Sequence, residues 1–598
     1  MIAWARLPLW SAGVVFLSIA CSYLLVWPVG EYLLEDEWAY TRSLYFLAEE
    51  GRLRILDYNP MSLVGHLAWG TLFTSVFGLG FTQAKLSTVV LLFVECLALM
   101  ALLRRVGAAE TTALLATLAM LFSPVHFFQS FFFATDVPTL AWSTLALLFY
   151  AKGFTESGPR SYRALLVAGL CVSWAWTIRQ GAIVGAAAPA LYLLLFDRAR
   201  LRDPKTLIAS FGPPAIAVLG LQYWYLFVHG PTSSYLLSSR DILGFLAGVD
   251  ARSLLGAVYA LSCYLAFFLL PVLLAARPPA IRALRGGRRM LLWVSWGSIA
   301  AGFLWFNVRL GMLFPYIRNK ITRFGYLSPN EVIVGARDPL WGDGVAWLWT
   351  VLLVIGFGLL VARWIVGPER QTGAAERPGE SGRTVTLRLA ALLLGLQLVY
   401  AFLTIGILFD RHLIALIPAA MVIFVGCLAS GSRLRPLPYA LTLIPLVFYS
   451  VAGTHDVHAF SRAATTAGRA LVEKGIDPQR IDAGLAFDGW HMYERSWPGA
   501  EARRPRHFAR NSDGNGHRDA IWVQGLTPGI LSQYVVSLSP RMQPRRWRPA
   551  LSHWAVELPQ PRLGLYRVVD QHPYFRYWPW GEAAVYTLVD RSLEEPAR

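Results

Sequence analysis

The chain has 598 residues, of which 55% are hydrophobic and only 15% are charged, whereas an average soluble protein has about 25% charged residues. This composition excludes an ordinary soluble protein and predicts a polytopic membrane protein, because many apolar runs reach the roughly 18–20 residues that span a bilayer. The net charge of +17 does not indicate nucleic-acid binding, because Lys and Arg concentrate in the short loops between the apolar runs.

Thirteen apolar segments are candidate membrane spans. They cover residues 8–29, 83–103, 110–123, 134–151, 162–178, 181–196, 207–228, 253–275, 290–309, 345–366, 387–408, 412–430 and 438–454. With the N-terminus inside, the loops rich in Lys and Arg all fall on the inner side, as the positive-inside rule requires. We read the first run as a retained anchor and expect about 13 transmembrane helices, with the C-terminus outside.

The first outer loop, residues 30–82, begins with the acidic cluster Glu35-Asp36-Glu37. Carboxylates are costly in hydrocarbon, so this cluster must lie at or beyond the membrane interface. Residues 39–50 are predicted to form a helix on the membrane surface, and the apolar stretch 63–81 a re-entrant or interfacial segment. A solvated acidic helix start, favoured by the helix dipole, is the simpler explanation of the cluster.

The tail after the last span is long enough for one small domain. We therefore divide the chain into a transmembrane domain, residues 1–454, and an outer soluble domain, residues 455–598. Residues 459–474 favour a helix, and residues 533–539, 563–569 and 583–589 favour strands because they are β-branched and aromatic. The outer domain is thus expected to be a small α/β domain, with a turn at residues 488–491.

The five cysteines all lie inside apolar runs, so we expect no disulfide and no cysteine metal site. The informative charged residues are those at the outer ends of the spans: Asp136, Lys85, Arg179 and Arg411, with His412 beside the last. Singly, Asp136 is explained as a helix cap, and each basic residue as a side chain that snorkels to the interface. Together they indicate a site for a phosphate at headgroup depth, because Arg and Lys bind phosphate. A nearby carboxylate would serve as the base for an incoming hydroxyl.

At these residues the chain resembles the GT-C glycosyltransferases, multi-span enzymes that use polyprenyl-phosphate sugars, and in particular aminoarabinose transferases and protein mannosyltransferases. The resemblance rests on Asp36-Glu37 after the first span, Lys85 before the second, Thr135-Asp136-Val137-Pro138, and Asp410-Arg411-His412-Leu413 with Pro418. Residues 134–137 and 178–180 also resemble the glucosyltransferase that finishes the eukaryotic lipid-linked oligosaccharide. The thirteen spans and outer domain match the aminoarabinose-transferase layout.

The resemblance implies roles for these residues. Asp36 would be the catalytic base, with Glu37 as its neighbour, and Asp136 would position the acceptor or assist Asp36. The lipid phosphate would be bound by Lys85, Arg179 and Arg411, together with His412. Transfer would be inverting and would use no nucleotide sugar. No His/Cys cluster with metal-ligand spacing occurs in the sequence, although two carboxylates could hold a divalent metal.

The expected partners are a polyprenyl-phosphate-linked sugar, a lipid or glycan acceptor and membrane lipids, with no nucleic acid. The expected location is a bacterial inner membrane, with the C-terminal domain periplasmic or extracellular. Two alternatives stay open. A surface-polysaccharide ligase or polymerase would use the same basic residues without needing Asp36, and a lipid or polysaccharide transporter would place charged residues near the middle of its spans, where only Glu95 lies.

Overall fold

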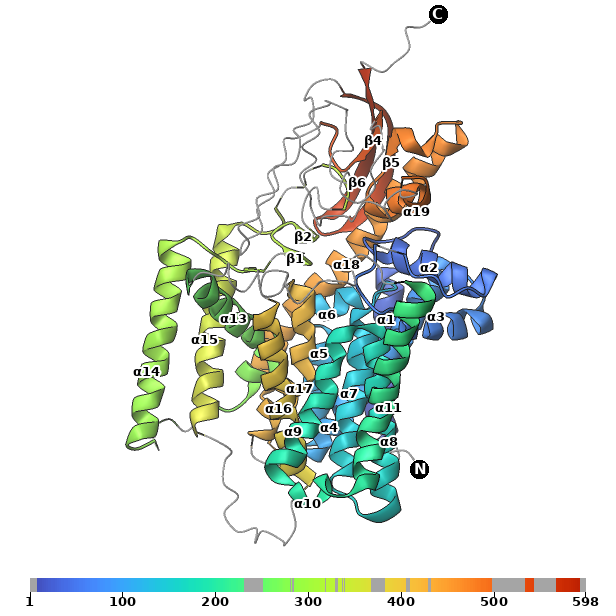
Figure 1. Cartoon of the computed structure of the whole chain (residues 1–598). Helices are drawn as coiled ribbons and strands as arrows, with labels where there is room; N and C mark the ends of the chain where they lie inside the picture. Colours follow the sequence, from blue (N-terminus) through green and yellow to red (C-terminus); the bar gives the residue numbers. More distant parts are fainter. Residues whose placement is uncertain are drawn as a thin grey trace, which may run out of the picture.

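The computed structural model describes residues 8–56, 58–230, 251–279, 281, 284–317, 319–327, 332–335, 337, 339–366, 382–404, 409–428, 432–496, 533–541 and 566–591. A bundle of long helices stands below a smaller region that contains the C-terminal strands (Figure 1). The predicted fold class is confirmed: a helical membrane protein with a small region of mixed helix and sheet at its C-terminal end.

Helices occupy all thirteen predicted spans. They are α1 (Leu9–Val26), α4 (Phe81–Arg105), α5 (Glu110–Leu121), α7 (Asp136–Gly153), α8 (Gly158–Ile178), α9 (Val184–Phe196), α11 (Pro204–Trp224), α13 (Ala251–Ala275), α14 (Gly287–Gly302), α15 (Asp343–Val366), α16 (Gly382–Leu403), α17 (Ile417–Gly426) and α18 (Pro436–Glu473). Among the described residues, nine helices are long and apolar enough to cross a membrane. The helix α5 and the segment Gln180–Phe196 are shorter apolar helices.

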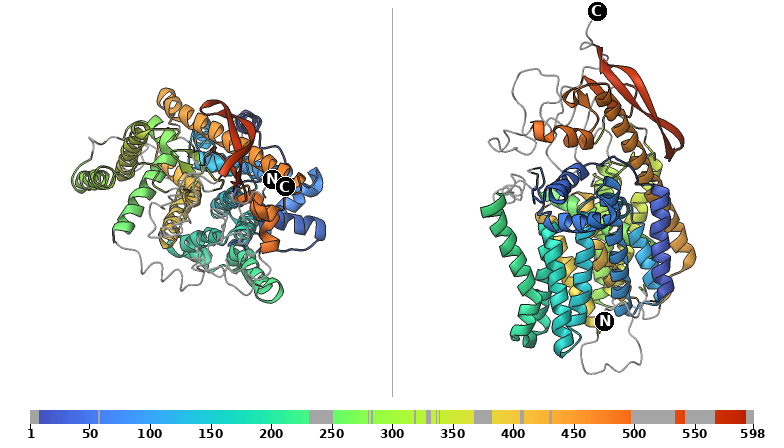
Figure 2. Two further views of the ribbon diagram at one scale, coloured as in Figure 1. Left: turned by 90° about the horizontal axis from the view of Figure 1, so that it is seen from above. Right: turned by 90° about the vertical axis from the view of Figure 1, so that its right-hand side faces the viewer.

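The first outer loop folds into two helices, α2 (Glu37–Glu50) and α3 (Val64–Phe77). Both lie across the upper end of the bundle rather than along it (Figures 1 and 2). The helix predicted over residues 39–50 is therefore present as α2. The apolar stretch 63–81 forms α3 and the start of α4, and α3, with 14 residues, is too short to span a bilayer.

The tail is joined to the membrane part by one uninterrupted helix. The 38 residues of α18 include both the last predicted span and the helix predicted over residues 459–474. The boundary predicted between residues 454 and 455 therefore falls in the middle of α18, and the division into two domains stays a prediction.

The C-terminal sheet contains the three strands that the sequence predicts, with a short fourth strand. It consists of β3 (Ile481–Asp482), β4 (Tyr534–Ser537), β5 (Tyr566–Tyr577) and β6 (Trp580–Asp590), in the order β3-β4-β6-β5. The pair β3–β4 is parallel and the other two pairs are antiparallel. Buried Val536 and Val585 of this sheet belong to the same hydrophobic core as the bundle helices, so the outer region packs on the membrane part.

The predicted turn at residues 488–491 is wrong, because these residues lie inside helix α19 (Leu485–Ser496). Leu485 and Met492 of this helix are buried together with Trp38 of α2. Gly489 permits the close approach, because a Cβ atom there would lie 2.3 Å from the Trp38 ring. The contact with α2, which no local pattern reveals, stabilises a helix in place of the turn.

The remaining elements are short. They are α6 (Pro124–Gln129), α10 (Arg198–Leu201), the 3₁₀ helices η2 (Gln180–Ile183), η7 (Asp410–Leu416) and η8 (Pro478–Arg480), the π-helical turns η3 (Tyr225–His229) and η5 (Phe303–Arg309), and the antiparallel pair β1 (Ile321–Thr322) and β2 (Gly325–Tyr326). The β1–β2 hairpin and the segment after it lie between the bundle and the C-terminal sheet (Figure 1). Val334 of that segment pairs with Ser537 of β4.

Candidate active site

The acidic cluster forms a tight turn that leads into α2. Glu35 has φ +42°, a left-handed conformation that is uncommon for a residue other than glycine. The Glu35 carboxylate forms an ion pair with Lys320, which lies just before β1. A strained backbone persists only where its surroundings hold it, and such strain concentrates at functional sites. The turn therefore presents the next residue, Asp36, in a fixed orientation.

Asp36 is held by one side chain of the same outer loop and by one from a distant part of the chain. The Tyr58 hydroxyl donates a hydrogen bond of 2.6 Å to Oδ1, and Arg411 donates one of 3.1 Å from Nη1 to Oδ2. Burial by itself would raise the pKa of Asp36, but Arg411, Lys320 and the Tyr58 hydrogen bond outweigh burial and lower it. Asp36 is therefore an ionised carboxylate at neutral pH, and its side chain is 19% exposed.

A second acid–base pair lies beside the first. Asp136 is the first residue of α7, and Arg179 lies between α8 and η2; their side chains form an ion pair. The hydroxyl of Tyr40 in α2 is within electrostatic reach of both pairs. The structure thus brings Asp36, Asp136, Arg179 and Arg411 together, as the sequence predicts.

His412 adjoins the same group of charges. Its ring lies within electrostatic reach of Arg179, Arg411 and Lys320. The His412 Nδ1 atom accepts a hydrogen bond of 3.3 Å from the backbone N–H of Phe409, which fixes the ring at the start of η7. His412 therefore lies on the cationic side of the site.

Glu37 and Lys85 form a separate, fully buried pair. Neither side chain is exposed, and Lys85 Nζ lies 4.0 Å from Glu37 Oε2. Lys85 also donates a hydrogen bond of 2.7 Å to the backbone oxygen of Tyr32 and lies 3.7 Å from the centre of the Tyr32 ring. The structure therefore does not bring Lys85 to Arg179 and Arg411, because its ammonium group is directed at Glu37 and Tyr32.

The Glu37 carboxylate connects the two acidic motifs. It accepts hydrogen bonds from the backbone N–H groups of Leu34, at 2.8 Å, and Phe133, at 2.7 Å. Leu34 precedes the turn that carries Asp36, and Phe133 lies three residues before Asp136. Glu37 thus fixes the spacing between the two motifs from inside the protein.

Sequence reasoning missed Tyr58 and Lys320, and it gave Asp410 no role beyond its place in the Asp410-Arg411-His412-Leu413 motif. Tyr58 binds Asp36, Lys320 binds Glu35, and Asp410 accepts hydrogen bonds from the backbone N–H groups of Lys320 and Ile321 at 2.9–3.0 Å. A signal existed for Lys320, because it is a cation in an outer loop where the positive-inside rule disfavours one. Nothing in the sequence marks Tyr58 apart from the other 23 tyrosines.

In the described part of the chain, no three His, Cys, Asp or Glu side chains come together in a way that could hold a metal ion.

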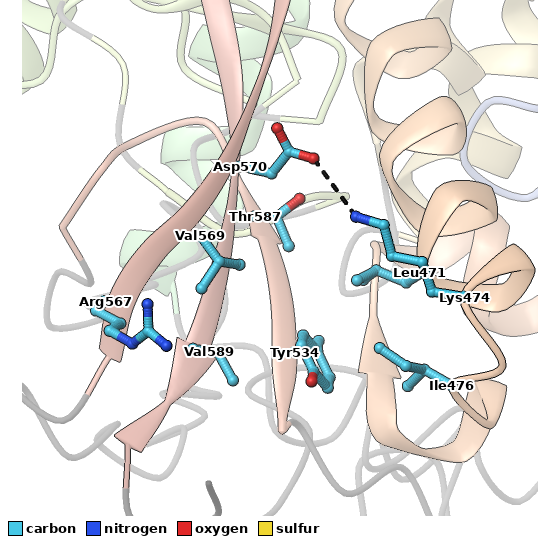
Figure 3. A pocket seen from close by; sticks show the side chains of 9 residues that line it. All are labelled: Leu471, Lys474, Ile476, Tyr534, Arg567, Val569, Asp570, Thr587 and Val589. Atoms are coloured by element: carbon cyan, nitrogen blue, oxygen red, sulfur yellow. Dashed lines mark ion pairs between the residues drawn. The ribbon is translucent and has the colours of Figure 1, made fainter. Parts of the chain in front are cut away.

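A hollow of about 230 Å³ lies away from this site, between the end of α18 and the C-terminal sheet (Figure 3). Across it, Lys474 faces Asp570 at 3.9 Å. Its lining includes none of the acid and base residues described above.

Part of the chain is similar to a known protein family. Residues 65–224 match the dolichyl-phosphate-mannose-protein mannosyltransferase family. This segment includes Lys85, Asp136 and Arg179. No curated protein sequence matches the chain significantly.

Several solved structures align with this chain over much of its length. ArnT from Cupriavidus metallidurans bound to undecaprenyl phosphate has 16% identity and a TM-score of 0.37, over 80% of this chain and 85% of that one. The apo oligosaccharyltransferase of Archaeoglobus fulgidus has 13% identity and a TM-score of 0.42, over 78% of this chain and 58% of that one. Arabinosyltransferase EmbB from Mycobacterium smegmatis has 13% identity and a TM-score of 0.31, over 66% of this chain and 41% of that one. The family match over residues 65–224 confirms the predicted resemblance to membrane glycosyltransferases that use a lipid-phosphate sugar.

Proposed function

We propose that this protein transfers a sugar from a polyprenyl-phosphate donor to a hydroxyl group of a glycolipid or glycan acceptor on the outer face of the membrane. The observation that carries the proposal is the juxtaposition of two Asp–Arg pairs, Asp36–Arg411 and Asp136–Arg179. They lie in a chain that is related over 160 residues to enzymes of this kind. The pairs offer both groups that the reaction needs, a carboxylate base and cations for a phosphate leaving group.

In the proposed reaction, the acceptor oxygen attacks the anomeric carbon of the sugar while the bond from that carbon to the phosphate oxygen breaks. The proton of the hydroxyl passes to Asp36, and the electron pair of the broken bond leaves with the polyprenyl phosphate. A single displacement inverts the configuration at the anomeric carbon. General-base assistance of this kind is typically worth about 10²–10⁴-fold in rate.

Asp36 is the proposed base because it is ionised, partly exposed and oriented by two partners. Arg411 and Arg179 are the proposed phosphate ligands, with His412 beside them. A guanidinium group fits an oxyanion in a bidentate manner, so a donor phosphate would share Arg411 with Asp36. Asp136 is proposed to place the acceptor, since its carboxylate, like that of Asp36, lies within electrostatic reach of Tyr40.

Two observations support the outer location of the site: the charges of the loops, and the position of the site at the same end of the helix bundle as the C-terminal tail. The turn that leads into α2 and the C-terminal sheet lie at the same end of the bundle, and α10, in a loop rich in Arg, lies at the other end (Figure 1). Labelling tests this orientation. A cysteine in place of Trp580, which is 76% exposed, should react in intact cells with a reagent that cannot cross the membrane.

The decisive experiment offers the purified protein a polyprenyl-monophosphate sugar together with candidate acceptors. Transfer with release of polyprenyl phosphate supports the proposal. Transfer only from a polyprenyl diphosphate would instead favour the ligase or polymerase alternative, and no transfer from either donor would contradict both.

A further inference from the structure

A second cleft, of about 260 Å³, lies where the outer end of the bundle meets the C-terminal sheet. Its walls come from the segment after β2, from α18 and from the end of β5. The residues that define its chemistry are Arg337, Asp456, Phe460, Tyr574, Arg576 and Trp578. None of them belongs to the site proposed for sugar transfer.

Two guanidinium groups line this cleft and are only partly engaged by the protein. Arg337 donates from Nη2 to the backbone oxygens of Tyr326, at 2.9 Å, and Leu327, at 3.0 Å. Its Nε atom is buried and has no hydrogen-bond partner among the described residues. The Nε atom of Arg576 is also buried and also has no hydrogen-bond partner among the described residues. A buried donor without an acceptor is costly, which points to a ligand that supplies one.

The acidic residue of the cleft is already engaged. Asp456 accepts hydrogen bonds from the backbone N–H groups of Tyr577, at 2.7 Å, and Trp578, at 3.1 Å, and its Oδ1 lies 3.0 Å from Nδ1 of His455. These contacts attach the end of β5 to α18. The single carboxylate therefore leaves an excess of positive charge in the cleft. The hollow of Figure 3 differs, because there Lys474 faces Asp570 directly.

The cleft adjoins a helix, α18, that is long and apolar enough to span the membrane. Trp578 packs on Phe448 of α18 with ring centres 5.0 Å apart. Phe448, Ile444 and Leu441 are 48%, 65% and 66% exposed on a helix long and apolar enough to span the membrane, as expected of side chains that face lipid. Trp side chains favour the boundary between hydrocarbon and water. A ligand in the cleft would therefore meet the membrane surface.

We propose that this cleft binds a phosphate group at the membrane surface, and that its occupant is the headgroup of a phosphate-bearing anionic lipid. Arg576 and Arg337 donate to the phosphate oxygens, because planar guanidinium groups match phosphate geometry. Phe460, over which Arg337 lies at 5.0 Å, and Tyr574 form walls beside the headgroup. The cleft differs from the sugar-transfer site, so binding here does not require that the protein be a transferase.

The test uses the full chain in detergent, titrated with short-chain phosphatidylglycerol and followed by native mass spectrometry. Short-chain phosphatidylcholine and inorganic phosphate are the other probes. The variant is Arg576→Gln, because the Nε atom of that side chain has no hydrogen-bond partner among the described residues, so the fold should survive its loss. The matched control is Arg480→Gln, which changes an exposed arginine of the same outer region that does not line the cleft.

We expect wild type and Arg480→Gln to bind phosphatidylglycerol alike and more tightly than phosphatidylcholine. Arg576→Gln should weaken binding at least about tenfold, as the loss of a charge-assisted contact predicts. Equal binding by Arg576→Gln and Arg480→Gln would overturn the proposal. Displacement of the lipid by inorganic phosphate at similar concentrations would retain the phosphate site but overturn the lipid as its occupant.

Discussion

Asp36 and Glu37 are neighbours in the chain, but their carboxylates have opposite surroundings. Asp36 is 19% exposed and is held by the side chains of Tyr58 and Arg411, whereas Glu37 is fully buried and is held by two backbone N–H groups and Lys85. Successive side chains of a helix point about 100° apart, since 3.6 residues make one turn. The start of α2 therefore presents one carboxylate to an accessible cluster and directs the next into the protein.

The pKa values of the two carboxylates are also shifted in opposite directions. Burial raises the pKa of Glu37 even though Lys85 opposes it, whereas the cations around Asp36 overcome burial and lower its pKa. Adjacent carboxylates therefore need not share a role. Asp36 has the exposure that a reacting base requires, and Glu37 has the contacts of an anchor between two segments.

The largest effect should follow from breaking the buried pair. Glu37→Gln leaves the Lys85 ammonium buried without its counter-ion, which typically costs about 3–5 kcal/mol. We expect a lower melting temperature in detergent, with Glu50→Gln, at the exposed end of the same helix, as the neutral control. Adding Lys85→Met to Glu37→Gln should recover part of the loss, because the unpaired charge is removed. A stable Glu37→Gln protein with slow transfer would instead make Glu37 a reacting group.

The next effect concerns the accessible carboxylate. Asp36→Asn keeps the shape of the side chain but cannot accept a proton, so transfer should slow at least about 100-fold. Folding, insertion and donor binding should remain. The measurement is transfer from a purified polyprenyl-phosphate sugar, alongside donor binding. Near-normal turnover by this variant would return the acidic cluster to the simpler role of a helix start.

The cation opposite Asp36 should have a smaller effect, on donor binding. Loss of one charge-assisted contact in Arg411→Ala should cost about 1.5–3 kcal/mol of donor affinity. Arg411→Lys should recover only part of it, because an ammonium group cannot bind in a bidentate manner. Titration with a polyprenyl-phosphate sugar measures both variants against Arg480→Gln. Unchanged affinity of Arg411→Ala would exclude Arg411 as a phosphate ligand.

The smallest effect is a shift along the pH axis. The folded protein lowers the pKa of Asp36. The contacts of the ionised Asp36 carboxylate therefore stabilise the protein fully at pH values above the ordinary pKa. This stabilisation is lost as the pH falls through the lowered pKa of the folded state. In Tyr58→Phe the hydrogen bond to Oδ1 is absent, and the acid limb of kcat/KM should move to higher pH. Turnover at neutral pH should change little. An acid limb at the wild-type position would show that Tyr58 does not tune Asp36.

The sequence predicted the spans, the surface helix and the gathering of Asp36, Asp136, Arg179 and Arg411, because apolar length and loop charge follow from local composition. It did not predict which acid meets which base. Lys320 lies 285 residues from Glu35, and Arg411 lies 375 residues from Asp36. Lys85 looked like a phosphate ligand because charge at a span end does not reveal burial. Helix α19 looked like a turn because its contact with Trp38 is tertiary.

The uninterrupted course of α18 has a mechanical consequence. Its 38 residues make a rod about 57 Å long, at 1.5 Å per residue, whereas the hydrocarbon core is about 30 Å thick. Close to half of the rod therefore projects past the bilayer, where β5 and β6 rest on it. Pro445 is the one proline inside this helix beyond its first turn, so a change of bilayer thickness that tilts the part of α18 after Pro445 would swing the projecting half with it. The outer sheet would move with it relative to α2, so membrane composition would be felt at the turn that carries Asp36.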